Sequence, residues 1–239
     1  MKTVVCFGAS LTAGTVSSNY VDLLAAQPAL AGFRFINHGV NGDLAWNGLQ
    51  RLGKVIADQP DYVTILIGTN DINATLSERN HLRYMEFNHL PENPTLEWYE
   101  ANLRAIVTRL KHETTAKLAM LSLAVIGEDL AHEANQKLAH YNEAIRRVAT
   151  DEAIAYLPFN EQLVAYLHDH EADRATLPPP LAYRDGLHNV GNALALHATG
   201  LSWDDVSRRN GLLVMTDTLH INSVGAGMIA DLIEGWLLS

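Results

Sequence analysis

The sequence predicts a doubly wound α/β fold with a parallel sheet, and three observations support this. Short apolar runs alternate with helical patterns along the chain, which favours strands joined by helical crossovers. The apolar runs lack polar–apolar alternation, as is typical of strands buried on both faces. Small and polar residues follow each of the first three runs, where a parallel sheet of this kind usually places its functional loops.

Five apolar runs are predicted as strands. They cover residues 3–8, 33–38, 62–68, 117–126 and 153–159. If the strand order is 2-1-3-4-5, the first strand lies between the second and the third. The turns after these three strands would then meet at one edge of the sheet, and we expect the functional site there.

Helical patterns lie between and after these strands. They cover residues 19–30, 44–58, 95–113, 131–151 and 222–238. Pro28 should end the first helix, because proline cannot continue a helix interior. Thr95 stands where an N-terminal cap is expected, with acidic residues behind it that suit the helix dipole.

Two long segments interrupt this alternation within a single predicted domain spanning residues 1–239. They cover about 77–94 and about 175–215. Long ordered connections are usually lids or binding loops. The alternative is a surface excursion with additional short helices.

Composition limits the classes of protein and partner. The chain has 239 residues, 48% of them hydrophobic, a net charge of -10 and a sequence pI of about 5.5. No run of Lys and Arg indicates a nucleic-acid partner. The single cysteine, Cys6, cannot form an intramolecular disulfide and suits a reducing compartment. Because we find neither a signal segment nor an apolar run long enough to span a bilayer, we expect a cytoplasmic protein without a membrane span.

The turns after the first three strands carry candidate functional residues. Ser10 follows Gly8 and Ala9 after the first strand, Gly42 follows the second, and "GTND", which contains Asn70, follows the third. A serine in this position can help to bind a phosphate, act as a nucleophile or simply cap a turn. The rest of the chain has to decide between these interpretations.

A fourth group of residues lies far away in the sequence. "TDTLH" places Asp217 three residues before His220, just ahead of the last predicted helix. A nucleophilic serine needs a base, and the base needs a partner that fixes its tautomer. The Ser10 and Gly42 amides and the Asn70 side chain could donate hydrogen bonds to a developing oxyanion. This combination favours a nucleophilic Ser10.

Together these four blocks resemble the SGNH hydrolases, also called the GDSL esterase/lipase family. The resemblance implies a flavodoxin-like three-layer α/β/α sandwich and serine ester hydrolysis. It implies that Ser10 is the nucleophile and first oxyanion donor, with Gly42 and Asn70 as the other donors, His220 as the base and Asp217 as its partner. One departure is visible: Ala9 stands where the family has Asp. We expect this change to affect hydrogen bonding around the nucleophile turn rather than the mechanism.

The resemblance also implies candidate substrates, namely small acyl esters, acetylated sugars and lysophospholipids. We expect Tyr84, Met85 and Phe87, in the 77–94 segment, to bind the substrate. We expect no cofactor and no metal, because serine chemistry requires neither and no metal-ligand spacing is visible. The sequence makes no prediction of oligomeric state.

Two alternative functions remain at this point. One is an acyltransferase that uses the same site and passes the acyl group to an alcohol. The other is a flavodoxin-like phosphate- or nucleotide-binding protein. The second lacks both specific phosphate fingerprints, Gly-x-Gly-x-x-Gly and Gly-Lys-Ser/Thr.

Overall fold

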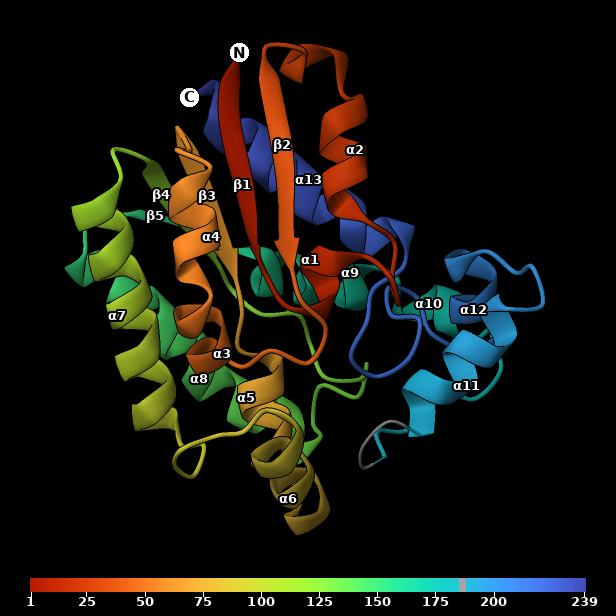
Figure 1. Cartoon of the computed structure of the whole chain (residues 1–239). Coiled ribbons are helices and arrows are strands. Elements are labelled where there is room, and N and C mark those ends of the chain that lie inside the picture. Colours follow the sequence, from red (N-terminus) through yellow and green to blue (C-terminus); the bar gives the residue numbers. More distant parts are fainter. Residues whose placement is uncertain (185–187) are drawn as a thin grey trace.

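The computed structural model describes residues 1–184 and 188–239, and it contains a five-stranded parallel sheet (Figure 1). The strand order is β2-β1-β3-β4-β5, which confirms the predicted fold class and topology. The strands are β1 (Lys2–Gly8), β2 (Phe33–Gly39), β3 (Tyr62–Leu66), β4 (Lys117–Leu121) and β5 (Ala155–Leu157). The last three are shorter than predicted, because the chain turns away from the sheet before the apolar runs end.

The strand register brings three carboxyl ends to the same level. Gly8 at the end of β1 is paired with Gly39 of β2 on one side and with Leu66 of β3 on the other. The segments that follow these strands therefore start side by side at one edge of the sheet (Figure 1).

Helices cover both faces of the sheet. On one face α13 packs against α2 and α9, and on the other α7 packs against α3, α4 and α8 (Figure 1). The bounds of the helices in these layers and at the sheet edge are α1 (Ser10–Ala13), α2 (Tyr20–Ala26), α3 (Ala45–Gln50), α4 (Leu52–Ala57), α5 (Thr69–Asn73), α7 (Leu96–Glu113), α8 (Glu133–Asp151), α9 (Phe159–Asp169) and α13 (Ser223–Leu238).

Three helical predictions differ from the structure. The first helix ends at Ala26, and Pro28 instead begins a 3-10 turn over Pro28–Leu30. The pattern over 44–58 forms two helices, because the backbone leaves helical geometry at Arg51. Helix α9 was not predicted: its first residue, Phe159, was assigned to the fifth strand, which ends before Pro158.

Both long insertions contain helices. The first is largely α6 (Glu78–Phe87), which Ser77 caps by accepting a hydrogen bond from the Asn80 amide. The second includes α11 (His188–His197) and α12 (Trp203–Arg209), after the short α10 (Glu171–Arg174). Residues 185–187 of this insertion lie outside the described part of the chain. The alternative interpretation of these two segments, a surface excursion, expected such additional short helices.

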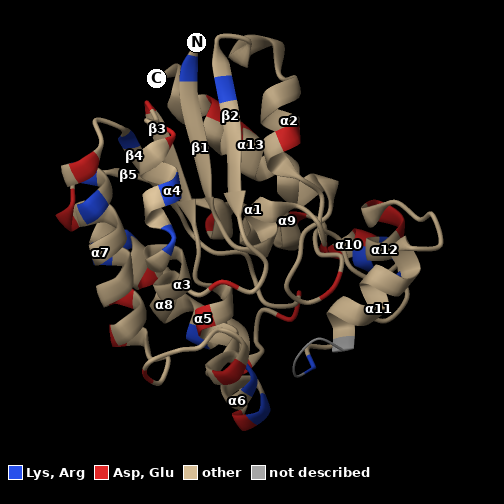
Figure 2. Cartoon of the chain, in the orientation of Figure 1, with Lys and Arg blue, Asp and Glu red and all other residues tan. Residues whose placement is uncertain are grey.

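The core is built on the strands β1 and β3, as their apolar sequences predict. Val4, Val5, Cys6 and Phe7 of β1 are completely buried. Burial raises the pKa of the Cys6 thiol to about 12, so this cysteine is a packing group rather than a reactive one. Acidic and basic residues are distributed over the outer helices and loops (Figure 2). None of the described helices combines the length and apolar character that a membrane crossing requires.

Candidate active site

Ser10 lies at the start of α1, directly after the turn that ends β1. Gly8 is required in this turn, because a Cβ there would approach the Thr12 hydroxyl oxygen to 2.2 Å and the Leu66 carbonyl oxygen to 2.4 Å. The Ala9 amide donates to the Leu66 carbonyl oxygen at 3.4 Å, and the Arg51 guanidinium donates to the Gly8 carbonyl oxygen at 2.8 Å. Backbone contacts and Arg51 therefore fix the turn without a carboxylate at position 9.

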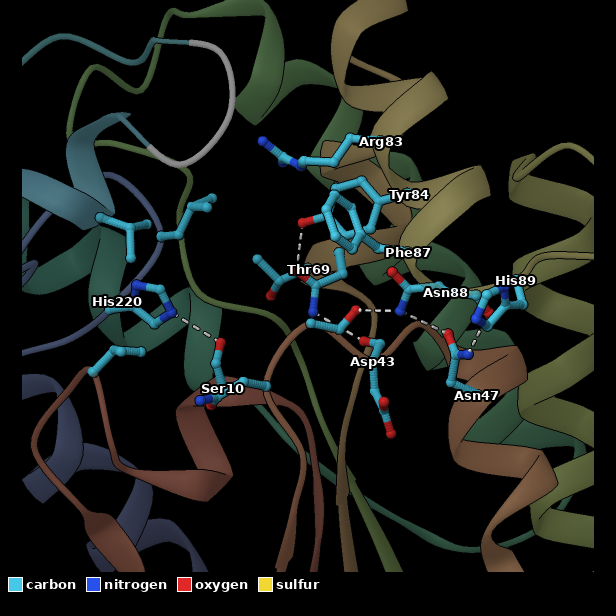
Figure 3. Close-up of a pocket in the computed structure, with 16 residues that line it drawn as sticks. Ser10, Asp43, Asn47, Thr69, Arg83, Tyr84, Phe87, Asn88, His89 and His220 are labelled. Carbon is cyan, nitrogen blue, oxygen red and sulfur yellow. Dashed lines mark hydrogen bonds between the residues drawn. The ribbon is translucent and has the colours of Figure 1, made fainter.

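His220 connects Ser10 to Asp217 through both of its ring nitrogens. Its Nε2 lies 2.9 Å from the Ser10 Oγ (Figure 3), and its Nδ1 lies 2.8 Å from the Asp217 Oδ2. Asp217 is completely buried and His220 is 5% exposed. The structure therefore brings together, in one hydrogen-bonded series, the three side chains for which the sequence predicted the roles of nucleophile, base and orienting carboxylate.

A tight loop holds Asp217 and His220 in these positions. The Thr216 amide donates to the His220 carbonyl oxygen at 2.8 Å, which closes the loop. The Asp217 Oδ1 accepts hydrogen bonds from the Leu219 amide at 2.6 Å and from the His220 amide at 2.8 Å. One carboxylate oxygen therefore shapes the loop while the other faces the imidazole.

Glu128 anchors the strand-like segment that leads into this loop. Its fully buried carboxylate accepts hydrogen bonds from three consecutive amides, at distances from 2.8 to 3.0 Å, and from Arg174 at 3.0 Å. The three amides belong to Leu213, Val214 and Met215. Glu128 was not singled out in the sequence, because it lies 85 residues before Leu213 and has no motif of its own.

Three hydrogen-bond donors line the pocket that contains Ser10. The Ser10 amide is at the N-terminus of α1, and Gly42 follows β2 with a φ of 83°, in the left-handed region that favours glycine. Asn70 lies in the first turn of α5. Its Nδ2 donates one proton to the Asp43 carbonyl oxygen at 2.9 Å, which leaves the second proton for a group in the pocket.

Tyr84 on α6 fixes the orientation of the Asn70 amide. Its hydroxyl donates to the Asn70 Oδ1 at 2.7 Å, and it accepts a hydrogen bond from the Asn73 Nδ2 at 3.0 Å. Since Asn73 donates to this hydroxyl, Tyr84 has its own proton available for Asn70. The Asn70 oxygen is therefore occupied by Tyr84, and the Nδ2 is the end of the amide that has a proton left to donate.

The loop that contains Gly42 is held from two directions. The Asn88 Nδ2, at the end of α6, donates to the Gly42 carbonyl oxygen at 2.9 Å (Figure 3). The Arg51 Nε forms an ion pair with the Asp43 Oδ2 at 2.5 Å, and another Arg51 nitrogen donates to the His38 carbonyl oxygen at 2.9 Å. Burial raises the pKa of Asp43, and the Arg51 guanidinium opposes that effect.

Comparison with known proteins gives the family. The model of the GDSL-like lipase/acylhydrolase family matches residues 6–201, which include Ser10, Gly42 and Asn70. The chain belongs to the GDSL-like lipase/acylhydrolase family. This membership confirms the resemblance on which the site was predicted.

Relatives of this GDSL-family chain include acetylxylan esterases. One from Geobacillus stearothermophilus is 28% identical over 144 residues, which are 58% of this chain and 61% of that relative. The match therefore spans less than two thirds of the relative's length. The crystal structure of the acetyl xylan esterase AlAXEase has a TM-score of 0.66 at 19% identity and covers 99% of this chain and 98% of its own.

A further solved relative is Axe2, an acetylxylan esterase from Geobacillus stearothermophilus. Its TM-score is 0.65 at 18% identity, over 97% of this chain and 92% of its own. Three of its structures are described as catalytic mutants, in which a serine, an aspartate or a histidine is replaced by alanine.

The pocket of the GDSL-family chain is a cavity of about 560 Å³ at the carboxyl edge of the sheet (Figure 3). Of the residues predicted to bind substrate, Tyr84 lines it from a buried position and Phe87 lines it with 76% of its surface exposed. Met85 is not among the residues that line the pocket; it packs against the buried cluster formed by Leu44, Ala74, Tyr84 and Leu90. Within the described residues, no three His, Cys, Asp or Glu side chains come together as a metal site.

Asp71, next to Asn70, connects two of the segments that form the site. It is buried and accepts hydrogen bonds from the Ala45 amide at 3.1 and 3.3 Å. Burial raises the pKa of this carboxyl to about 8. Asp71 therefore joins the start of α3 to α5, and it is held in the protonated form at neutral pH.

Proposed function

We propose that this chain hydrolyses carboxylic esters through an acyl-enzyme on Ser10. The observation that carries the proposal is the hydrogen-bonded series from Ser10 Oγ to His220 Nε2 at 2.9 Å and from His220 Nδ1 to Asp217 Oδ2 at 2.8 Å. In the relative Axe2, the mutated aspartate and histidine also stand three residues apart, as Asp217 and His220 do. Together with the family, these features support a serine mechanism over phosphate binding.

In the acylation step, the Ser10 Oγ attacks the ester carbonyl carbon. His220 accepts the serine proton at Nε2, and its Nδ1–H donates to Asp217, whose carboxylate stabilises the imidazolium. The carbonyl π bond breaks and its electron pair moves onto the oxygen. When the tetrahedral intermediate collapses, the bond to the alcohol oxygen breaks and His220 returns the proton to the alcohol.

The negative charge that develops on the carbonyl oxygen is stabilised by three donors. They are the Ser10 amide, the Gly42 amide and the Asn70 Nδ2, all of which line the same pocket. Because Tyr84 and Asn88 already hold Asn70 and Gly42, these donors need little reorganisation during the reaction. Mutations of such donors in other enzymes reduce kcat by about 10²–10³-fold.

The deacylation step uses the same groups with water in place of the alcohol. His220 removes a proton from the attacking water, whose oxygen bonds to the acyl carbon. The bond from that carbon to the Ser10 Oγ then breaks, His220 returns the proton to the Oγ, and the acyl group leaves as a carboxylic acid. If an alcohol occupies the position of the water, the product is a new ester. The acyltransferase alternative differs in this step alone, and analysis of products with and without an added alcohol separates the two reactions.

For substrates, we propose esters with a small acyl group, with acetylated sugars as the first class to test. The names of the acetylxylan esterase relatives support this choice. Polar side chains such as Asn41 and His89 in the pocket also suit a hydroxylated alcohol better than a long acyl chain. The measurement is hydrolysis of acetylated xylo-oligosaccharides beside a series of p-nitrophenyl esters of increasing acyl length.

Labelling with a fluorophosphonate tests the central role of Ser10. We expect wild-type protein to be labelled and to hydrolyse p-nitrophenyl acetate, and Ser10→Ala to lose both properties. Ser239→Ala, which removes an exposed hydroxyl at the C-terminus, is the matched control and should behave as wild type. Undiminished labelling or ester hydrolysis by Ser10→Ala would show that another residue is the nucleophile.

A further inference from the structure

Arg83 contributes to the pocket a positive charge that no carboxylate of the described residues pairs with. It is half-buried on α6 and lines the cavity that contains Ser10 and His220 (Figure 3). The lining also includes Asp43, whose carboxylate forms an ion pair with Arg51. The protein as a whole has a net charge of -10, so a local positive charge in its pocket is an exception to its overall charge.

The guanidinium of Arg83 has hydrogen-bonding capacity that the described residues leave unused. Its Nη2 is buried and has no hydrogen-bond partner. Among the described residues Arg83 also has no ion pair, although α6 carries acidic residues as well as basic ones (Figure 2). Glu86, three residues further along the helix, is exposed and does not pair with it. A buried donor without a partner carries a desolvation cost that a ligand can remove.

Packing against Tyr84 fixes where this charge lies. The Arg83 guanidinium carbon is 5.0 Å from the centre of the Tyr84 ring, in cation–π geometry. Tyr84 is in turn held by its hydrogen bond to Asn70. The cation is therefore preorganised beside the proposed oxyanion donors, and this lowers the cost of binding an anion there.

We infer that Arg83 binds a carboxylate carried by the ester substrate. This inference rests on the proposed esterase function and specifies its substrate class. A planar guanidinium suits a carboxylate, to which it can donate two parallel hydrogen bonds. The carboxylate can belong to the alcohol part or to the acyl part of the ester, and the substrates below distinguish these two sources.

The test compares anionic and neutral esters of matched shape. For the alcohol part, the pair is 4-acetoxybenzoate and its methyl ester. For the acyl part, the pair is mono-4-nitrophenyl glutarate and 4-nitrophenyl pentanoate. The variants are Arg83→Gln, Arg83→Lys and, as a matched control, Arg79→Gln, which removes an exposed positive charge from the same helix outside the pocket. Comparing variants within each pair cancels the intrinsic reactivity of the esters.

We expect Arg83→Gln to reduce the anionic-to-neutral ratio of kcat/KM by about 10-fold to 100-fold in one of the two pairs. Arg83→Lys should retain part of that ratio, and Arg79→Gln should retain all of it. Neutral esters and fluorophosphonate labelling of Ser10 should be nearly unchanged in every variant. If Arg83→Gln slows anionic and neutral esters equally in both pairs, or if Arg79→Gln has the same effect, the inference is wrong.

A binding measurement keeps this inference separate from the esterase proposal. Benzoate should raise the melting temperature of wild type and of Arg79→Gln but not of Arg83→Gln, and neutral benzamide should raise none of them. This result does not depend on chemistry at Ser10. A benzoate effect without ester hydrolysis would overturn the esterase proposal alone. Ester hydrolysis with an anionic-to-neutral ratio that does not depend on Arg83, and with no benzoate effect that depends on Arg83, would overturn the carboxylate inference alone.

Discussion

Replacing Tyr84 by phenylalanine tests whether α6 orients the proposed oxyanion donor. The change removes one oxygen atom, which donates to the Asn70 Oδ1 at 2.7 Å and accepts from the Asn73 Nδ2 at 3.0 Å. Without this hydroxyl only the hydrogen bond from the Asn70 Nδ2 to the Asp43 carbonyl oxygen holds the Asn70 amide, so the amide is less firmly oriented toward the developing negative charge. The Tyr84 ring, which is 6% exposed, keeps its packing in the variant.

The expected size of the effect follows from these contacts. Loss of a complete oxyanion donor lowers kcat by about 10²–10³-fold. Because Tyr84→Phe leaves Asn70 in place but unoriented, we expect a smaller decrease in kcat, of about 10-fold, with little change in KM. The two buried amide groups left without a partner should each lower the free energy of unfolding by about 1–3 kcal/mol.

A double-mutant cycle with Asn70→Ala distinguishes orientation from general damage. If Tyr84 acts through Asn70, adding Tyr84→Phe to Asn70→Ala should not reduce kcat further. Tyr166→Phe, on α9 and outside the pocket, is the control for removal of a tyrosine hydroxyl. The assay is steady-state hydrolysis of p-nitrophenyl acetate, with urea unfolding in parallel. Independent, multiplicative effects of the two substitutions on kcat would refute the orienting role.

Two further predictions concern buried charge. The pKa of Asp71 is raised to about 8 by burial, so between about pH 4 and pH 8 the folded state retains a proton that the unfolded state has lost. Stability should therefore fall as pH rises through this range, by about 1 kcal/mol per pH unit from this group, and urea unfolding of Asp71→Asn should lack that slope. Arg51→Met should lower the free energy of unfolding by about 3–5 kcal/mol, because the side chains of Asp43 and Arg51 are only 11% and 14% exposed and the substitution leaves the Asp43 carboxylate without its partner. Adding Asp43→Asn to Arg51→Met should restore part of this stability. A loss below about 1 kcal/mol in Arg51→Met would contradict the prediction.

The fold was predictable because its strands are buried on both faces and its helices alternate with them. The elements that were predicted wrongly or not predicted have physical causes. An apolar run as short as 153–159 has no readable period, so the sequence does not show that the strand stops before Pro158 and that a helix starts at Phe159. Helix α6 was missed because its buried residues are Asn80 and Tyr84 rather than an apolar stripe.

The sequence was sufficient to propose the site residues that the structure brings together, but it did not indicate the residues that hold them in place. Ser10, Gly42 and Asn70 follow strand ends, and topology alone brings strand ends together. Glu128 and Arg51 act on segments far away in the sequence: Glu128 is 85 residues from Leu213, and Arg51 is 43 residues from Gly8. No local pattern marks such contacts, because a Glu or Arg that makes a long-range contact cannot be distinguished in the sequence from one that is exposed on the surface.

The sequence suggested one role for the 77–94 segment, which was substrate binding, but helix α6 in this segment has two. Through Tyr84 and Asn88 it holds Asn70 and Gly42, and through Arg83 it faces the pocket directly. Removing the 77–94 segment would therefore disturb the proposed oxyanion donors and the proposed substrate contacts together, and activity toward every ester should fall. Only point substitutions can separate the two roles, because Tyr84→Phe acts on the donors and leaves the pocket charge, whereas Arg83→Gln removes the charge and leaves both hydrogen bonds to the donors intact.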